Sequence, residues 1–338
     1  MKVSVVVPFY SARRFVPAAI ENLRHHIAPD VEFVLVDDAS PDGTREALEE
    51  HAATLPGARV VARSTNGGLA SARNSGVDES VGRYVTFLDA DDWYGRGYLG
   101  ELVATIERLP CDFVRVDHVQ VRGRKRVIVR SPEGRRDEVF EPQASILPFD
   151  RSSGVDYPYA WAGIFDVERM GKQLLRFDDG LHTCEDRPWL WRLYLRASSH
   201  AVVGLHGLFY RREVAGSLTQ VADRRQLHFI DAFDQIIADV TADADDARRY
   251  LVKAIRSYCA IIAHHLREDG RFAPALRREL HERSAAALHR LPSDVLSYVL
   301  AEMDRRRAAH LRSLMRRHPP SAAGAVTTGQ PTVAGTRR

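Results

Sequence analysis

Short apolar runs alternate with amphipathic segments along the first 115 residues. The apolar runs are rich in branched side chains and are continuous, which is typical of strands that are buried on both faces. They predict strands at 3–7, 31–36, 59–62 and 83–88. Apolar residues at helical spacing follow each run and predict helices over about 11–26, 44–54, 69–79 and 97–109.

This regular alternation of strand and helix predicts a parallel sheet with helices on both faces. Ligands of such sheets bind at the carboxyl ends of the strands. Those ends carry polar or turn residues at Pro8-Phe9-Tyr10, Asp37-Asp38, Asn66-Gly67-Gly68 and Asp89-Ala90-Asp91. We therefore expect one functional edge of the sheet.

The pattern changes after residue 112. The expected elements are strands at 113–119 and 127–129 around a turn at 122–125, a helix over 187–196, and short strands at 201–204 and 207–210. Residues from about 223 to 318 show only helical spacing. The final stretch, 319–338, is small and polar, which predicts disorder.

Composition excludes several classes of protein. The 338 residues are 28% charged and 45% apolar with a net charge of +3, the balance of a globular protein without a nucleic-acid groove. Cys111, Cys184 and Cys259 are far apart and lack CxxC spacing, so neither a zinc site nor a disulfide scaffold is expected. The start is too short for a signal peptide and no apolar run is long enough to span a bilayer, which predicts a cytoplasmic protein.

The most informative stretch is the end of the fourth strand, where Asp89, Asp91 and Asp92 follow an apolar run. Clustered carboxylates repel one another, and a hard divalent cation relieves that repulsion. On its own, the stretch is also explained as a polar turn in which Asp92 caps the next helix. The same turn chemistry explains Asp37 and Asp38 when they are considered alone.

Known nucleotide signatures are absent from the sequence. It contains neither a GxGxxG fingerprint nor a P-loop, and it lacks the glycine-rich loop of sugar-nucleotide pyrophosphorylases. The series of strand ends, continued by the segment from Leu69 to Gly76, instead resembles the family 2 inverting glycosyltransferases with a GT-A fold. The resemblance is dense over residues 1–115 and looser over 155–220.

The resemblance implies an α/β, Rossmann-like and mostly parallel sheet with helices on both faces, followed by an α-helical C-terminal extension. The domains implied are a catalytic domain at 1–220 (1–115 for the nucleotide sugar and 116–220 for the acceptor side), a helical region at 221–318 and a disordered tail at 319–338.

The family's donor-binding roles fall on residues at the strand ends. The resemblance assigns nucleotide-sugar binding to Pro8, Tyr10, Asp37, Asp38, Asn66, Arg73 and Asp89. Asp91, together with Asp89, is the implied ligand of Mn²⁺ or Mg²⁺, which bridges the diphosphate. For Arg73 the alternative is a solvated helix face.

The acceptor side is implied by the segment Thr183 to Trp189, which resembles the family's Glu-Asp motif. Asp186 is the candidate general base, with Glu185 and Trp189 near the acceptor; simple capping of a helix is the alternative for Asp186. Trp161 and Trp189 are candidates for a wall that stacks on sugar, or for core packing. The segment that contains Arg211 and Arg212, followed by Ser217 and Thr219, resembles the family's segment that closes the catalytic domain. The resemblance implies that Arg211 or Arg212 reaches the diphosphate.

The implied function is metal-dependent, inverting transfer of a sugar from a nucleotide-diphosphate sugar, with a UDP-sugar expected first. The implied acceptor is a hydroxyl of a glycan, a cell-wall polymer or a lipid-linked glycan. The alternative is a non-catalytic protein of the same fold that binds a nucleotide sugar or acts as a scaffold. A nucleotidyltransferase is disfavoured by the missing glycine-rich loop.

The helical C-terminal region lies outside the resemblance. Arg305–Arg307 and Arg316–Arg317 lie near an amphipathic stripe. They are explained either as the solvated face of a packed helix or as a contact with an anionic polymer or with acidic lipid headgroups. The region is also a candidate for peripheral contact with a membrane and for a homo-oligomer contact.

Overall fold

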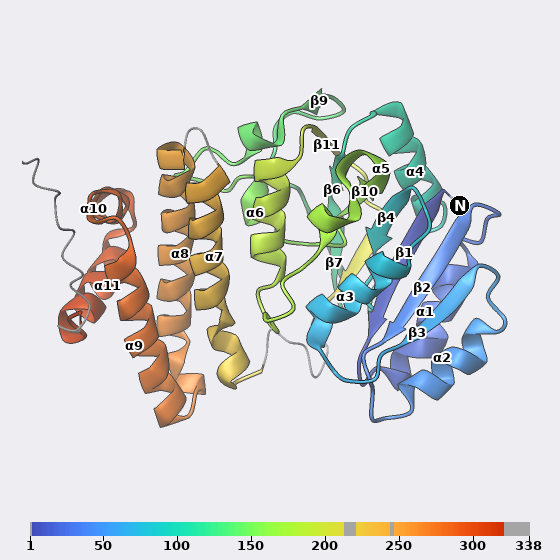
Figure 1. The fold of residues 1–338 in the computed structure, drawn as a ribbon, viewed down its shortest axis with the longest axis horizontal. Helices are drawn as coiled ribbons and strands as arrows, with labels where there is room; N and C mark the ends of the chain where they lie inside the picture. The colour runs from blue at the N-terminus through green and yellow to red at the C-terminus, as the bar shows by residue number, and fades with distance from the viewer. Residues whose placement is uncertain (1, 213–220, 244–246, 321–338) are drawn as a thin grey trace, which may run out of the picture.

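The computed structural model describes residues 2–212, 221–243 and 247–320. An eight-stranded main sheet forms the centre of its N-terminal part (Figure 1). Across the sheet the order is β3 (Ala58–Ala62), β2 (Val31–Asp37), β1 (Val3–Phe9), β4 (Tyr84–Phe87), β10 (Gly163–Asp166), β6 (Phe113–Val116), β11 (His200–Val203) and β9 (Val139–Phe140).

The four strands β3, β2, β1 and β4 are parallel, which confirms the expected sheet. Strand β10 is antiparallel to both of its neighbours, β4 and β6, and the sequence pattern did not predict it. The helices of this part are α1 (Val16–Arg24), α2 (Thr44–Ala52), α3 (Gly68–Glu79), α4 (Tyr98–Arg108), α5 (Val167–Met170) and α6 (Asp186–Arg196). The α/β GT-A class inferred from the sequence is therefore the fold of this region.

A second sheet brings the two halves of the N-terminal part together. Its order is β5 (Trp93–Tyr94), β12 (Leu208–Arg211), β7 (His118–Arg122) and β8 (Lys125–Val129). Strand β12 pairs with β5, which directly follows the acidic turn after β4. This pairing places residues from beyond 207 beside that turn.

Helix α3 packs closely on the main sheet because one of its residues has no side chain. A Cβ on Gly76 would collide with Val6 of β1 and would also lie 3.3 Å from a methyl group of Val36 in β2. The helix begins at Gly68, whose φ of +84° favours glycine. Helix α3 thus packs directly against β1 and β2.

The C-terminal part is helical, as the sequence predicted. Its helices are α7 (His228–Asp243), α8 (Ala247–Arg267), α9 (Pro274–Arg290), α10 (Ser293–Glu302) and α11 (Arg305–Arg317), with 3₁₀ turns η6 (Arg224–Leu227) and η7 (Asp269–Arg271). Figure 1 shows α7 beside α6, with α8 beyond it and α9 to α11 at the far end.

The hydrophobic core is continuous from the sheet into these helices. Val5, Trp189, Phe233 and Leu311 belong to one cluster of buried side chains. The division of the chain at residue 220 therefore stays a prediction. Within the described ranges, no helix is long and apolar enough to cross a membrane. Of the predicted disordered tail, residues 321–338 lie outside the described residues.

Candidate active site

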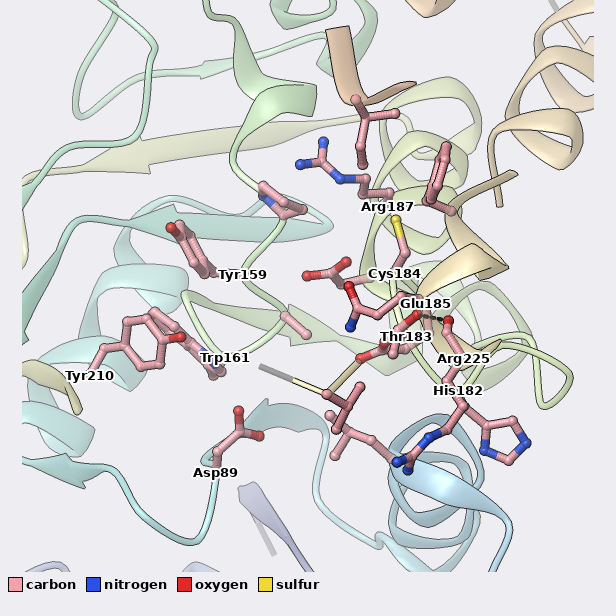
Figure 2. A pocket seen from close by; sticks show the side chains of 18 of the residues that line it. Asp89, Tyr159, Trp161, His182, Thr183, Cys184, Glu185, Arg187, Tyr210 and Arg225 are labelled. Carbon is pink, nitrogen blue, oxygen red and sulfur yellow. Dashed lines mark hydrogen bonds between the residues drawn. The ribbon is translucent and has the colours of Figure 1, made fainter. Parts of the chain in front are cut away.

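A cavity of about 1320 Å³ opens at the carboxyl ends of β1, β2 and β4. Figure 2 shows Asp89 on one side of it, with Glu185 and Arg187 on the opposite side. The start of α6 forms that opposite wall, and helices α8 and α11 complete it. The functional edge expected from the sequence is therefore the floor of a cavity that both parts of the chain enclose.

The acidic turn after β4 brings three carboxylates close together. Asp89 and Asp91 line the cavity. Burial, and then the charge of Asp89, raise the pKa of Asp91 to about 6. The predicted capping role of Asp92 is wrong, because α4 has Gly97 as its N-cap. Asp92 is buried and accepts a hydrogen bond of 2.7 Å from the backbone N–H of Arg211, which ties β12 to the turn.

Asp38, at the end of β2, organises the loop that precedes α3. Its carboxylate accepts hydrogen bonds from Asn66 Nδ2 at 2.9 Å and from the backbone N–H groups of Gly67 and Gly68 at 3.0 and 2.8 Å. Arg63 adds an ion pair of 2.8 Å. Asp38 and Asn66 both line the cavity, but the Asp38 carboxylate is occupied mainly with holding this loop.

Asp37 was predicted to bind the nucleotide, and the structure does not bring it into the site. It lies outside the described lining of the cavity and is buried. Its carboxylate accepts a hydrogen bond of 3.2 Å from Ser40 N, which is the turn chemistry considered as its alternative. The side chains of a strand point alternately to opposite faces, so adjacent residues such as Asp37 and Asp38 rarely reach the same ligand.

Pro8 and Tyr10 both line the cavity, at the end of β1. Tyr10 is 52% exposed. Its ring is therefore available to stack on a planar ligand.

Arg73 bridges the two acidic walls of the cavity. Its guanidinium forms ion pairs of 2.8 Å with Asp89 and 3.1 Å with Glu185, and it is only 3% exposed. The ring of Phe177 lies 5.4 Å from its Cζ. The solvated helix face considered for Arg73 is thus wrong. Its planar fork is instead engaged by two carboxylates, which differs from the open contact with a diphosphate that the resemblance implies.

Asp186 is the first residue of α6 and lines the cavity. It follows Glu185 and Cys184, and the latter has an unusual φ of +64° that turns the chain into the helix. Burial, followed by the charge of Glu185, raises the pKa of Asp186 to about 7, against the opposing charges of Arg187 and Arg73. A carboxylate with a pKa near neutral is suited to accept a proton from a substrate.

The two tryptophans considered for a sugar wall have different places. Trp161 lines the cavity and stacks on Tyr159 with ring centres 4.7 Å apart. Trp189 was predicted to lie near the acceptor, but it is fully buried, stacks on Phe177 at 4.8 Å and donates a hydrogen bond to Leu175 O. Trp189 is therefore core, because it faces the sheet side of α6.

An aromatic wall of Tyr159, Trp161 and Tyr210 forms the remaining side of the cavity (Figure 2). Neither Tyr159 nor Tyr210 was predicted as a site residue, although the stretch 156–165, which includes Tyr159, is rich in aromatic residues. Apolar ring faces beside polar groups are typical of carbohydrate sites.

Arg211 and Arg212 both line the cavity. Arg211 Nε donates to the backbone carbonyl of Asp91 at 2.9 Å, and Arg212 donates to the Tyr210 hydroxyl at 3.1 Å. Arg211 is thus fixed to the acidic turn, and Arg212 to the aromatic wall. The Ser217 and Thr219 of the closing segment lie outside the described residues.

The acidic turn suits a divalent cation that also takes oxygens from a ligand. Across the described ranges, no group of three or more His, Cys, Asp or Glu side chains is arranged to hold a metal ion by itself. Mg²⁺ commonly uses only one or two carboxylates together with substrate phosphates. The raised pKa of Asp91 and the unpartnered buried Oδ2 of Asp92 both indicate excess negative charge that a cation would relieve.

The comparison with known families agrees with this site. Residues 4–168 match the family described as glycosyl transferase family 2. Residues 4–168, just under half of this chain, are therefore of the family 2 glycosyltransferase type. The match spans β1 to β10 and includes every strand end discussed above up to Asp91.

Curated relatives extend the similarity. The chain is 27% identical over 220 residues to the uncharacterized glycosyltransferase EpsJ of Bacillus subtilis (strain 168), covering 65% of this chain and 63% of EpsJ. It is 25% identical over 253 residues to the poly(ribitol-phosphate) beta-N-acetylglucosaminyltransferase TarS of Staphylococcus aureus (strain Mu50), covering 74% of this chain and 42% of TarS. The chain thus spans less than two thirds of the length of either relative.

Solved structures show the same fold. Residues 1–349 of S. aureus TarS in complex with UDP-GlcNAc superpose with a TM-score of 0.74 at 18% identity, covering 94% of this chain and 91% of that one. The mannosyltransferase PcManGT from Pyrobaculum calidifontis, in complex with GDP-Man and Mn²⁺, gives a TM-score of 0.54 at 18% identity, with coverages of 92% and 79%.

Proposed function

We propose that this protein transfers a sugar from a nucleotide-diphosphate sugar to a hydroxyl group of a glycan, cell-wall polymer or lipid-linked acceptor, with inversion at the anomeric carbon. The observation that carries the proposal is the meeting, in one cavity, of the acidic turn with Asp91 and the base-like carboxylate of Asp186. The family 2 domain supports the same class of reaction.

Asp186 is proposed as the general base. Its carboxylate takes the proton from the acceptor hydroxyl, whose oxygen attacks the anomeric carbon as the bond from that carbon to the diphosphate oxygen breaks. The electron pair of the broken bond leaves with the nucleotide diphosphate. One displacement inverts the configuration, so a single carboxylate is enough and no covalent sugar–enzyme intermediate forms.

Donor binding is proposed for the open side of the acidic edge. Tyr10 is available to stack on the base, while Pro8, Asn66 and Asp38 line the place where base and ribose would lie. Arg211 and Arg212 supply positive charge toward the diphosphate. A UDP-sugar is the first candidate donor because the TarS structures of the same fold contain UDP-GlcNAc and UDP.

Asp91 and Asp89 are proposed to hold Mn²⁺ or Mg²⁺. When bound, such an ion neutralises negative charge on the leaving diphosphate. Arg73 binds Asp89 in the free protein and orients it, and it also holds Glu185 on the acceptor side. Glu185 is proposed to position Asp186 rather than to exchange a proton, since its charge raises the pKa of Asp186.

A thermal-shift screen tests the donor part of this proposal. UDP, GDP, CDP and dTDP are added separately, each with and without Mn²⁺, and stabilisation follows affinity by mass action. We expect a uridine nucleotide to raise Tm, more strongly with Mn²⁺, and Asp91→Asn to lose the effect of Mn²⁺ while still responding to the nucleotide. If none of the nucleotides shifts Tm of the folded protein, the proposal is wrong.

A further inference from the structure

Guanidinium groups from three separate elements of the C-terminal part line the cavity. Arg256 comes from α8, Arg271 from η7 and Arg307 from the first turn of α11. We call these three residues the arginine wall. Arg256 is half-buried, and Arg271 and Arg307 are exposed to the cavity.

Arg256 and Arg271 of the arginine wall donate hydrogen bonds to neutral oxygens. Arg256 donates to the backbone carbonyls of Asp150 and Glu302 at 3.1 and 3.4 Å, and Arg271 donates to the side-chain oxygen of Gln226 at 2.9 Å. In the described ranges, no carboxylate lies within ion-pair distance of these three guanidinium groups. Neutral oxygens thus hold Arg256 and Arg271 in place, and among the described residues no ion pair compensates the charge of any of the three arginines.

Neighbouring charges do not cancel this excess. Lys253 also lines the cavity, but Asp156 forms an ion pair of 2.5 Å with it and compensates its charge. Asp304 is used as the N-cap of α11, where it accepts from Arg307 N at 3.1 Å. Asp150 also lines the cavity, and the next residue in the sequence is a further exposed cation, Arg151.

The same cavity also carries acidic groups. Its lining includes the carboxylates of Asp38, Asp89, Asp91, Glu185 and Asp186. A cavity of about 1320 Å³ exceeds the range of about 300–1,000 Å³ that holds one drug-sized ligand, so it has room for two substrates. Like charges gathered in a concave surface focus the field and attract ions of the opposite sign.

We propose that the arginine wall binds anionic groups of the acceptor, so that the acceptor is a glycan carrying phosphodiester or carboxylate groups. This inference rests on the proposed transfer function, because it names the substrate that meets Asp186. Guanidinium groups suit both anions, since their planar fork makes paired, charge-assisted hydrogen bonds.

The geometry favours a polymer over a lipid surface. Of the basic run at the start of α11, Arg307 lines the cavity, whereas Arg305 and Arg306 are exposed outside its described lining. Arg316 and Arg317 at the other end of the helix are likewise exposed outside it. A flat bilayer cannot reach into a concave site, but an extended chain can.

Fluorescence anisotropy with three labelled oligomers tests the inference: a glycerol-phosphate oligomer, an oligoglucuronate and a neutral dextran oligomer. The full chain is compared with the triple variant Arg256→Gln, Arg271→Gln, Arg307→Gln, and with Arg316→Gln as a matched control on α11. We expect an anionic oligomer to bind more tightly than dextran and to weaken with salt. The triple variant should lose at least about tenfold in affinity, while Arg316→Gln keeps it.

The outcomes separate this inference from the proposed function. Loss of oligomer binding with unchanged UDP binding in the triple variant supports the arginine wall, and the better of the two anionic probes identifies its ligand. Equal binding of dextran, or equal affinity of the triple variant, overturns it. Binding to anionic lipid vesicles without binding to either oligomer also overturns it. Failure of UDP to bind the wild-type chain would instead contradict the proposed function.

Discussion

Replacing Asp186 by Asn should abolish most transfer activity and, above neutral pH, stabilise the free protein. The amide has nearly the shape of the carboxylate but can neither accept a proton nor carry a charge. Loss of a general base typically costs about 10²–10⁴-fold in rate. A residue that merely caps a helix would give a different result, because Asn is itself an acceptable cap.

The gain in stability follows from the pKa of Asp186. Burial and Glu185 raise this pKa from 3.8 to about 7, so the folded state binds the proton more tightly than the unfolded state does. The stability that the folded state gains from this tighter proton binding is fully present below about pH 4 and is lost as pH rises to about 7. Each pKa unit corresponds to about 1.4 kcal/mol, so Asp186→Asn should gain on the order of 2–4 kcal/mol above neutrality.

Two measurements check this prediction on the same samples. Urea unfolding gives the free energy of unfolding at about pH 5 and about pH 8, where the advantage of Asp186→Asn should be larger at the higher pH. Release of UDP from a UDP-sugar gives the rate. Glu50→Gln, an exposed acid on α2, is the matched control and should change neither quantity. The assignment of the base fails if a folded Asp186→Asn enzyme keeps its rate within a few fold, or if it is less stable at about pH 8.

Three further outcomes follow from the same contacts. Nucleotide binding in the presence of Mn²⁺ should strengthen as pH rises through about 6, because the ion competes with the proton on Asp91. A chelator or Asp91→Asn should remove that pH dependence. Nucleotide affinity that does not change with pH would contradict the metal role. Arg73→Met should raise the pH midpoint of the transfer rate, since Arg73 lowers the pKa of Glu185 and Asp186. An unchanged pH profile of the rate would contradict the role of Arg73 between the two acidic walls. Trp189→Phe should lower the free energy of unfolding by about 1–3 kcal/mol with unchanged KM for donor; a raised KM with unchanged stability would place Trp189 in the site.

The floor of the site could be predicted because parallel strands bring their carboxyl ends to one edge. Pro8, Asp38, Asn66 and Asp91 follow separate strands, and the pattern of buried strands was enough to place them together. The short length and the branched side chains of the apolar runs also favour strands for β1 and β2.

The walls of the site could not be predicted in the same way, because they depend on packing between distant segments. The burial of Arg73 results from Asp89 and Glu185 approaching from two sides, which no local pattern encodes. A tryptophan is a residue type that often stacks on sugars, yet Trp189 lies on the face of α6 that packs into the core. The arginines from the C-terminal helices enter the cavity only because α7 docks on α6.

The configuration of the sugar released by slow donor hydrolysis tests the central claim most directly, because it needs no knowledge of the acceptor. Rapid ¹H NMR of the protein with Mn²⁺ and an α-linked UDP-sugar records the anomeric signal before mutarotation. We expect the β-anomer to appear first, and Asp186→Asn to release no sugar. Release of the α-anomer first, or equal release by Asp186→Asn, would contradict inverting transfer with Asp186 as the base.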